Sequence, residues 1–355
     1  MSGPLKIATW LEHYKGGGVE RVAVRLAHDW MELGHQVAIL ASPVERQLRV
    51  DLPTDVEWVP HFGGRKTAAE AIGKVAPDIF FCPGNHYTSA AARIRLHLKD
   101  RSPPIVWKVS NDLARKDMSW PMQVANRVWV GLHYRFADRV VAMSRAMAED
   151  AVARTGVPRE RIDIIENPHL AVGGGPAALP LAPHYILGIG RLEPQKAWDL
   201  AIRAYAQADT GDRPLIIYGE GSERAKLTAL IERLGLTGRV FLPGFVEGLE
   251  EVIERADLLL LTSRYEGRPN VVIEALSTGT PVVATESSVA MRELLVDPGS
   301  GRLLESREAK AVARGIEAVL ASPRPAPTGK AADPLASAQA YIDTFRKAID
   351  QRHGS

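Results

Sequence analysis

Cysteine is almost missing from this sequence, and long apolar runs are missing altogether. The 355 residues include a single cysteine, Cys82, which cannot form a disulfide within the chain and cannot supply the several ligands of a Cys/His zinc site. No apolar run approaches the ~18 residues of a membrane-spanning helix. The start of the chain also lacks the charged segment and the long apolar segment of a signal peptide. These absences predict a reduced, cytoplasmic protein.

A strong excess of charge of one sign is missing too. The 44 basic and 42 acidic residues leave a net charge of +2, which is too small to indicate a nucleic-acid partner. Hydrophobic residues make up 46% and charged residues 24%, which is the composition of a globular protein and excludes disordered and collagen-like chains. At about 150 residues per domain, the length predicts two domains.

Basic residues are nevertheless concentrated in one part of the first half. This run comprises Arg93, Arg95, Lys99, Arg101, Lys108, Arg115 and Lys116. Such a run usually forms a solvated helix face. The alternative is a surface that meets anionic lipid or an anionic acceptor, where each basic residue adds about 1 kcal/mol.

Short β-branched runs alternate with longer helical stretches, which is typical of an α/β fold with parallel sheets. A segment without period or charge, from Gly173 to Pro183, reads as a linker between two such series. The pattern predicts two doubly wound domains over residues 1–170 and 184–325. It also predicts a final helix over residues 333–351, with an apolar stripe of Leu335, Ala338, Tyr341, Ile342, Phe345 and Ile349. The strands are expected near Leu5–Trp10, Gln36–Ala41, Asp78–Cys82, Ile105–Val109, Arg139–Met143, Ile162–Ile165, Tyr185–Ile189, Pro214–Tyr218, Val240–Leu242, Leu258–Thr262 and Pro281–Ala284.

A glycine-rich loop follows the first expected strand. Gly16, Gly17 and Gly18 invite comparison with a dinucleotide-binding fingerprint, but Arg21 stands where its third glycine belongs, and no acid follows the second strand. NAD binding is therefore not expected. The glycines would let backbone amides approach an anion or a sugar at a helix N-terminus, or they form a turn without a ligand.

Two cations follow the first expected strand of the second domain. Arg191 ends this strand and Lys196 stands just before the next helix. Both would lie at the carboxyl end of a parallel sheet, beside a helix N-terminus that favours anions. This arrangement suits a diphosphate, and the sequence has no Asp-x-Asp pair that would hold a metal there. The alternative is a surface ion pair.

Two glutamates stand around a later strand-to-helix loop. Glu266 lies in the loop after the strand Leu258–Thr262, and Glu274 lies about one turn inside the following helix. That helix is apolar nearly all round, which predicts that it is buried. A buried carboxylate needs hydrogen-bond partners, and ribose hydroxyls or neighbouring amides would serve. Structural roles for both glutamates remain the alternative.

The segment from Glu266 to Ala284 resembles the core motif of the GT-B glycosyltransferases of family GT4, the retaining glycogen-synthase-like group. Further segments are similar to motifs of this family in the same order along the chain. They are Gly16–Val19 with Glu20, Val141–Ser144, Ile165–Asn167, Gly190–Leu192 with Lys196, Tyr218–Ser222 and Leu242–Val246. The resemblance implies two Rossmann-like domains facing a central cleft, with the C-terminal helix packing back on the N-terminal domain. It assigns the acceptor to residues 1–170 and the nucleotide sugar to residues 184–325.

The resemblance also implies roles for the residues at the matching positions. Arg191 and Lys196 would bind the donor's diphosphate and stabilise it as the leaving group. The third catalytic position is Glu266, which would hold the hydroxyls of the transferred sugar. The donor-binding positions are Gly17, Gly18, Glu220, Val246, Gly267, Arg268, Pro269, Asn270 and Glu274. Among these, Glu274 would hold the ribose and the Val246 backbone would meet the base.

Three positions depart from the family's pattern. Where the family often has His-Asp, this chain has Asn111 and Asp112, and an asparagine cannot act as a base. Lys196 is followed by Ala197 and not by the usual glycine, and Asn167 is followed by Pro168. His86, at the end of an earlier strand, is expected to be either structural or a contact for the acceptor or the sugar, together with Asn111 and Asp112.

The implied function is a retaining, metal-independent transfer of a sugar from a nucleotide-diphosphate sugar to a glycan or lipid-linked acceptor, as in polysaccharide biosynthesis. The donor is expected to be a UDP- or GDP-sugar, with no cofactor and no nucleic-acid partner. The N-terminal domain could touch the inner leaflet of the cytoplasmic membrane. Two alternatives remain: an inactive nucleotide-sugar-binding protein, and a GT-B-type nucleotide-sugar epimerase.

Overall fold

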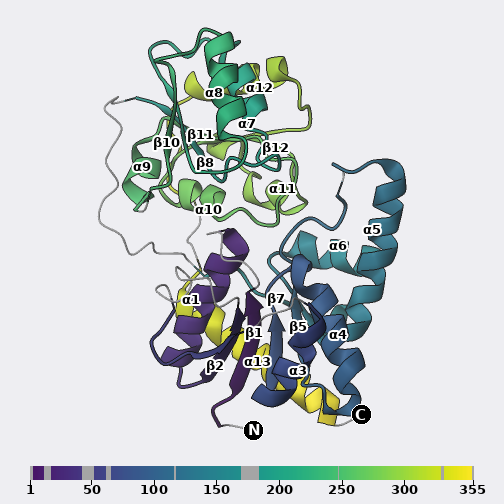
Figure 1. Ribbon diagram of the computed structural model, residues 1–355. Helices are drawn as coiled ribbons and strands as arrows, with labels where there is room; N and C mark the ends of the chain where they lie inside the picture. Colours follow the sequence, from purple (N-terminus) through teal and green to yellow (C-terminus); the bar gives the residue numbers. More distant parts are fainter. Residues whose placement is uncertain are drawn as a thin grey trace. The chain divides into compact units, whose positions relative to one another are not determined.

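In the computed structural model, the described residues are 3–11, 17–41, 52–60, 65–115, 117–168, 184–246, 248–328 and 332–353. The expected linker from Gly173 to Pro183 lies outside them, as do Gly16 and Lys116 of the predicted basic run. The chain forms two compact units (Figure 1). The first unit comprises Met1–Leu170 and Ala332–Ser355, and the second comprises Ala171–Ala331.

The first unit has a parallel sheet with the strand order β3-β2-β1-β4-β5-β6-β7. Strand order reverses between β1 and β4, and ligands of doubly wound sheets bind at such a switch point. The strands are β1 (Lys6–Leu11), β2 (Gln36–Ala41), β3 (Glu57–Pro60), β4 (Ile79–Cys82), β5 (Ile105–Lys108), β6 (Arg139–Ala142) and β7 (Ile162–Ile164). The helices are α1 (Gly18–Glu32), α3 (Arg65–Val75), α4 (Thr88–Leu98), α5 (Trp120–His133), α6 (Arg145–Thr155) and α13 (Pro334–His353).

The second unit repeats this plan with the strand order β10-β9-β8-β11-β12-β13. Its switch point lies between β8 and β11. The strands are β8 (Ile186–Ile189), β9 (Leu215–Tyr218), β10 (Val240–Gly244), β11 (Leu258–Leu261), β12 (Val282–Thr285) and β13 (Gly301–Leu304). The helices are α7 (Trp198–Tyr205), α8 (Arg224–Arg233), α9 (Glu250–Arg255), α10 (Asn270–Ser277), α11 (Ala290–Leu294) and α12 (Ala309–Leu320). The two sheets confirm the predicted doubly wound α/β fold.

One edge strand in each sheet, β3 and β13, was not predicted from the sequence. A central parallel strand is covered on both faces and reads as a continuous apolar run, as β4, β8 and β11 do. The edge strands are only partly buried, and in β3 no residue is fully buried. Their sequences therefore lack the apolar run by which the other strands were recognised.

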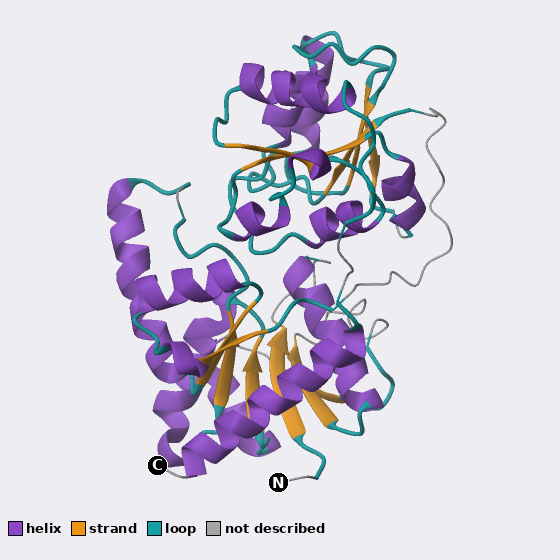
Figure 2. Cartoon of the chain, turned by 180° about the vertical axis from the view of Figure 1, so that it is seen from behind, coloured by secondary structure: helices purple, strands orange, loops and turns teal. Residues whose placement is uncertain are grey.

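The C-terminal helix α13 packs on the first unit, where Figure 2 shows it crossing the sheet. Its rings at Tyr341 and Phe345 join the core around Trp30 of α1 and Phe81 of β4. The ring centres of Trp30 and Phe345 are 5.3 Å apart, as are those of Phe81 and Tyr341. The predicted apolar stripe is buried except at Leu335, near the start of the helix, which is exposed.

The predicted run of basic residues does not form a uniform solvated face. Arg93, Lys99 and Arg101 are exposed, but Arg95 forms a mostly buried ion pair with Asp138. Lys108, the last residue of β5, is only 2% exposed. Burial disfavours its charged form and lowers the pKa of Lys108 from 10.5 to about 7.

Replacing Lys108 by methionine should stabilise the protein. Between pH 7 and 10.5 the unfolded chain holds a proton on this lysine that the folded chain has released, so the free energy of unfolding rises with pH over this range. In Lys108→Met this contribution to the slope should vanish, and the stability at pH 7 should rise by about 2 kcal/mol. Urea unfolding of parent and variant across the range would measure both effects.

The exposed Lys99→Met variant is the matched control, and its stability should follow that of the parent within about 0.5 kcal/mol. A Lys108→Met variant that is less stable than the parent at pH 7 would show that the buried ammonium is held by favourable interactions.

Candidate active site

Two glycines bring the loops after β8 and β9 into backbone contact. Gly190 and Gly219 have φ angles of +152° and +146°, and a Cβ on Gly219 would lie 2.1 Å from the carbonyl oxygen of Gly190. The amide of Leu192 donates to the oxygen of Glu220 at 2.8 Å, and the amide of Glu223 donates to the oxygen of Leu192 at 2.8 Å. These close contacts, which only glycine permits, fix the path of the chain that carries Arg191.

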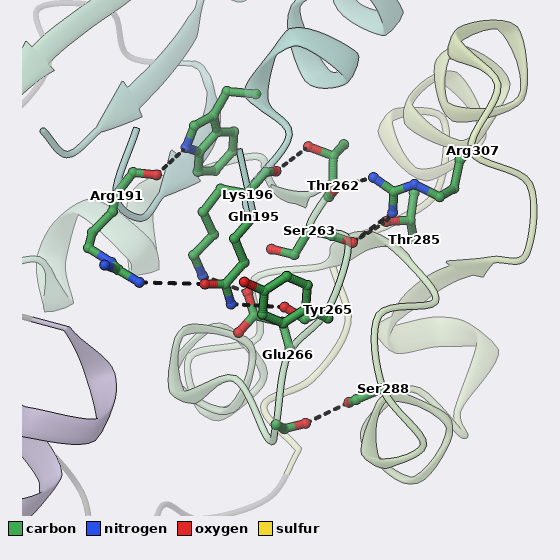
Figure 3. A network of polar contacts seen from close by, with 12 residues as sticks. Arg191, Gln195, Lys196, Thr262, Ser263, Tyr265, Glu266, Thr285, Ser288 and Arg307 are labelled. Carbon is green, nitrogen blue, oxygen red and sulfur yellow. Dashed lines mark hydrogen bonds and ion pairs between the residues drawn. The ribbon is translucent and has the colours of Figure 1, made fainter. Parts of the chain in front are cut away.

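The side chain of Lys196 folds back over the end of β8. A Cβ on Gly190 would lie 2.8 Å from Lys196 Cε, so the absence of a side chain there makes room for the lysine. Lys196 Nζ donates to Glu266 Oε1 at 2.7 Å (Figure 3). The two side chains are only 15% and 10% exposed. Residues predicted separately from two motifs thus form one largely buried ion pair.

This ion pair lies at the switch point of the second sheet. Lys196 follows β8 and Glu266 follows β11, the two neighbouring strands between which the strand order reverses. The carboxyl ends of parallel strands at such a point form the ligand-binding edge of a doubly wound sheet. The fold itself therefore puts both charges where a ligand is expected.

A set of backbone contacts holds the two loops together. The Thr262 hydroxyl donates to the oxygen of Ala197 at 3.0 Å, and Gln195 Nε2 donates to the oxygen of Tyr265 at 2.9 Å. The amide of Arg264 donates to the oxygen of Gln195 at 2.7 Å. These bonds keep the lysine and the glutamate at a fixed separation.

Arg191 is held far less tightly than Lys196. Its side chain is exposed, and its contact with Gln195 Oε1 is long at 3.5 Å. The Arg191 backbone is fixed, because its carbonyl oxygen accepts a bond of 3.1 Å from the indole of Trp198 (Figure 3). The guanidinium can therefore reorient toward an anion without breaking a strong bond.

Ala197, the departure from the family's glycine, has a left-handed backbone with φ 49° and ψ 47°. This conformation costs about 1 kcal/mol for a residue with a Cβ and little for glycine. A glycine, which the resemblance leads one to expect after Lys196, would adopt this conformation at little cost. Here the bond from Thr262 helps to hold the strained turn that precedes α7.

Arg307 is a component of the site that the sequence analysis missed. Its guanidinium donates to the carbonyl oxygens of Ser263 and Thr262, each at 2.7 Å, and to the Thr285 hydroxyl at 2.8 Å (Figure 3). Burial lowers the pKa of Arg307, since the charged form is disfavoured there. It joins the carboxyl ends of β11 and β12. A single arginine between β13 and α12 gives no signal in the sequence.

The other predicted donor contacts lie around these loops. Glu220 forms a two-pronged ion pair with Arg224, at 2.7 and 2.6 Å, on the exposed rim. Gly267 is buried, and its carbonyl oxygen accepts a bond of 2.6 Å from Ser288. Pro269, also buried, is the N-cap of α10, and Arg268 and Asn270 beside it are half-buried. Val246, also half-buried, follows β10.

The prediction that α10 is buried all round is wrong. Val272, Ala275 and Leu276 form its buried face, whereas Glu274 is half-buried. The apolar residues Val271 and Ile273 are half-buried as well, so the apolar composition of this short helix predicted more burial than it has. Glu274 is therefore accessible to a ligand, and its charge does not lie in the core.

In the first unit, Gly17 is the N-cap of α1 and Gly18 is its first residue. A Cβ on Gly17 would lie 2.4 Å from Glu20 Oε2, so glycine lets the glutamate fold over the start of the helix. The two glycines follow β1, one of the two strands at the switch point of this sheet.

His86, Asn111 and Asp112 line one pocket of about 220 Å³ in the first unit. Its walls also include Asn126, Trp129 and His133 of α5. Burial lowers the pKa of His133 to about 4, so this wall is uncharged at neutral pH. The three residues predicted for the acceptor or sugar thus come together, although they follow two different strands.

Reciprocal hydrogen bonds shape the floor of this pocket. The amide of Asn85 donates to Ser110 Oγ at 3.1 Å, and the amide of Ser110 donates to Asn85 Oδ1 at 3.2 Å. A Cβ on Gly84 would lie 2.8 Å from Ser110 Oγ. These contacts join the loops after β4 and β5.

The described residues contain neither a cluster of metal ligands nor a membrane-spanning helix. Nowhere in this part of the chain do three or more His, Cys, Asp or Glu side chains lie together as a metal ion would require. Likewise, no described helix combines the length and the apolar character needed to cross a bilayer.

Two family models match the chain in succession. The model described as Glycosyltransferase Family 4 matches residues 16–169, and the one described as Glycosyl transferases group 1 matches residues 176–333. Together they account for most of the chain, one in each half.

Curated proteins with related sequences are themselves glycosyltransferases. An N-acetylgalactosamine-N,N'-diacetylbacillosaminyl-diphospho-undecaprenol 4-alpha-N-acetylgalactosaminyltransferase of Campylobacter jejuni is 30% identical over 251 residues, covering 68% of this chain and 66% of that protein. A lipopolysaccharide core biosynthesis glycosyltransferase of Rhizobium meliloti is 28% identical, covering 53% and 56%. The chain thus spans about two thirds of the first relative's length and about half of the second's.

Solved structures match over nearly the whole chain. HepE of Anabaena, in complex with UDP and glucose, has a TM-score of 0.70 at 24% identity, covering 99% of this chain and 98% of that one. The apo form of the lipopolysaccharide outer core galactosyltransferase WaaB has a TM-score of 0.65 at 21% identity, covering 98% and 99%. These likenesses show the shared fold. The chain belongs to the glycosyltransferases of family GT4 and has their GT-B fold.

Proposed function

We propose that this protein transfers a sugar from a nucleotide-diphosphate sugar to a glycan or lipid-linked acceptor, with retention of the anomeric configuration and without a metal ion. The observation that carries the proposal is the ion pair of Lys196 and Glu266 at the switch point of the second sheet. The named activities of the relatives support it, since the Campylobacter protein acts on a diphospho-undecaprenol acceptor. UDP in the Anabaena structure supports a nucleotide donor.

The donor's diphosphate would bind beside Lys196 and Arg191. Lys196 is already desolvated and oriented by Glu266, so its ammonium needs little reorganisation to stabilise negative charge that develops on the leaving group. Arg191 is exposed and weakly held, so it can close on the diphosphate from the solvent side. The mobile side chain of Arg191 would thus first bind the diphosphate, and the fixed side chain of Lys196 would then stabilise its negative charge.

Glu266 would bind the transferred sugar through its second carboxylate oxygen. Lys196 occupies Oε1, and Glu266's own amide is already bonded to the oxygen of Ser287 at 2.8 Å. Glu274 would bind the ribose hydroxyls from the first turns of α10, where its half-burial leaves it within reach of a ligand.

In the proposed reaction, the bond between the anomeric carbon and the diphosphate oxygen breaks, and a bond to the acceptor's hydroxyl oxygen forms on the same face of the sugar. The hydroxyl proton passes to an oxygen of the departing diphosphate. The products are the glycosylated acceptor and the nucleoside diphosphate. The protein's cations lower the barrier by stabilising the leaving group, and neither an enzymic nucleophile nor a cofactor takes part.

The acceptor would bind in the pocket lined by His86, Asn111 and Asp112. Its walls offer an imidazole, an amide, a carboxylate and the ring of Trp129, which together suit a sugar's hydroxyls and its apolar face. An acceptor on a lipid would place the protein at the cytoplasmic face of a membrane, in peripheral contact through the first unit.

Replacing Lys196 should remove most of the turnover. Loss of one preorganised charge beside a developing anion costs about 10²–10³-fold in kcat. Lys196→Met alone also leaves Glu266 buried without its partner, so the double variant Lys196→Met with Glu266→Gln is the informative protein. It should keep the melting temperature of the parent and still lack activity, as measured by release of UDP or GDP in the presence of acceptor.

Lys226→Ala removes an exposed lysine of the same unit that pairs with Glu223, and it should behave as the parent does. Because Glu266 is itself proposed to bind the sugar, Glu266→Gln alone is a second control, and the further loss in the double variant reports on Lys196. If the folded double variant turns over as fast as Glu266→Gln, Lys196 is only a structural partner of Glu266.

Glu274→Gln should weaken binding of the donor. A hydrogen bond between a carboxylate and a ribose hydroxyl contributes about 1.5–3 kcal/mol, which corresponds to a rise in KM for the nucleotide sugar of roughly 10–100-fold. The inhibition constant of the nucleoside diphosphate should rise by the same factor, because the diphosphate keeps the ribose. The exposed Glu232→Gln on α8 is the control, and equal inhibition constants for all three proteins would argue against ribose binding.

EDTA should leave the transfer rate of the parent unchanged. The proposed role of Lys196 and Arg191 is to supply the positive charge that a divalent ion supplies elsewhere. Initial rates would be measured after dialysis against EDTA and again after Mg²⁺ or Mn²⁺ is returned. Activity that is lost on chelation and recovered with the metal would contradict this part of the proposal.

A further inference from the structure

Helix α5 of the first unit turns its apolar residues to solvent and its polar residues inward. Among its 14 residues only Val130 and His133 are buried. Gln123 and Asn126 lie on the inner side, where Gln123 Nε2 donates to the oxygen of Met118 at 2.7 Å and Asn126 Nδ2 donates to the oxygen of Leu113 at 3.2 Å. A surface helix ordinarily has the opposite orientation, with its apolar face against the core.

The outward face is a continuous apolar surface. Trp120, Val124, Val128 and Leu132 follow one another at intervals of four residues, so they form one row along the helix. Their exposed fractions are 76%, 45%, 60% and 44%. Met122 and Trp129 on other sides of the helix are exposed as well, at 56% and 53%, and Trp129 also lines the pocket described above. Contiguous exposed apolar surface of this kind marks an interaction site.

The composition of α5 favours a lipid surface as the occupant. The helix has no acidic residue, and its charged side chain is the exposed Arg127. Tryptophans stand near both ends of the apolar row, and tryptophan prefers the boundary between headgroups and acyl chains. A helix with an apolar face, tryptophans and basic but no acidic charge is suited to lie in the interface of an anionic membrane.

The same helix forms a wall of the pocket described above. Asn126, Trp129 and His133 of α5 face His86, Asn111 and Asp112 across that pocket. Figure 1 shows α5 at the side of the first unit, next to α6 and α4. A membrane against the outward face would therefore lie one helix away from the pocket.

We infer that α5 is an interfacial helix, which docks this protein on an anionic membrane through Trp120, Val124, Val128 and Leu132. The inference rests on the proposed function in one respect, since a lipid-linked acceptor would then reach the pocket behind α5 from the surface on which the protein sits. The docking itself requires no donor and no turnover.

Sedimentation with vesicles tests the docking without any substrate. The probes are vesicles of phosphatidylcholine and phosphatidylglycerol in equal parts, and vesicles of phosphatidylcholine alone. The parent should bind the anionic vesicles more tightly. The double variant Trp120→Ser with Val128→Ser should bind at least about tenfold more weakly, because two apolar side chains no longer enter the interface. Both positions are exposed, so the fold should be retained.

Val296→Ser is the matched control, since it removes an apolar side chain that is 73% exposed on the second unit. It should bind vesicles as the parent does, and all three proteins should show the same thermal shift with UDP or GDP. Absence of vesicle binding by the parent, or equal binding by the double variant, would overturn the inference. So would a concentration-dependent dimer of the parent that the double variant abolishes, because a second copy would then cover α5.

Fluorescence adds a position-specific readout. Trp10, Trp30, Trp107 and Trp198 are buried and Trp58 is half-buried, so brominated lipids should quench mainly the exposed Trp120 and Trp129. Trp120→Phe should keep vesicle binding and lose part of the quenching. Binding without any quenching would show that another surface meets the lipid. A protein that docks in this way but transfers no sugar would refute the proposed function and leave the docking intact.

Discussion

The ion pair between Lys196 and Glu266 is the interaction on which the candidate site depends. Each charge is largely withdrawn from water, so neither would be tolerated there alone, and together they are neutral. The pair also connects the two strands between which the order of the sheet reverses. A diphosphate that arrives beside it meets an ammonium that is already desolvated and aimed. The stability of this part of the fold and the proposed binding of the donor therefore depend on the same two side chains.

Glycine makes this arrangement possible, and the two units use it in the same way. Gly190 leaves room for the Lys196 side chain, and Gly219 lets the next loop touch the backbone of Gly190. In the first unit, Gly84 leaves room for Ser110, whose hydroxyl and amide exchange hydrogen bonds with Asn85. In each unit the loops that follow neighbouring strands approach more closely than side chains would allow. Polar groups at the carboxyl edge of each sheet thereby become fixed parts of the fold.

The sequence predicted what depends on local pattern and missed what depends on packing. Central strands such as β4 and β11 are buried on both faces and were recognised from their apolar runs, whereas the edge strands β3 and β13 have no such run. Lys196 and Glu266 were each predicted from a motif, but their contact links residues 70 positions apart. Arg307 and the burial of Lys108 gave no signal at all, because one arginine or one lysine in a polar or apolar stretch is ordinary.

Helix α5 shows why the direction of a helix face is hard to predict from sequence. Periodicity defines an apolar face on a helix, but the direction of that face depends on what the neighbouring chain can bond or cover. In α5 the neighbouring backbone at Leu113 and Met118 accepts bonds from Asn126 and Gln123, and these bonds turn the polar side inward. The apolar side must then face outward, although water is the poorest solvent for it. Exposed apolar surface destabilises this orientation, and the inward hydrogen bonds and the packing of Val130 must outweigh that destabilisation. Contact of the outward face with lipid would remove it.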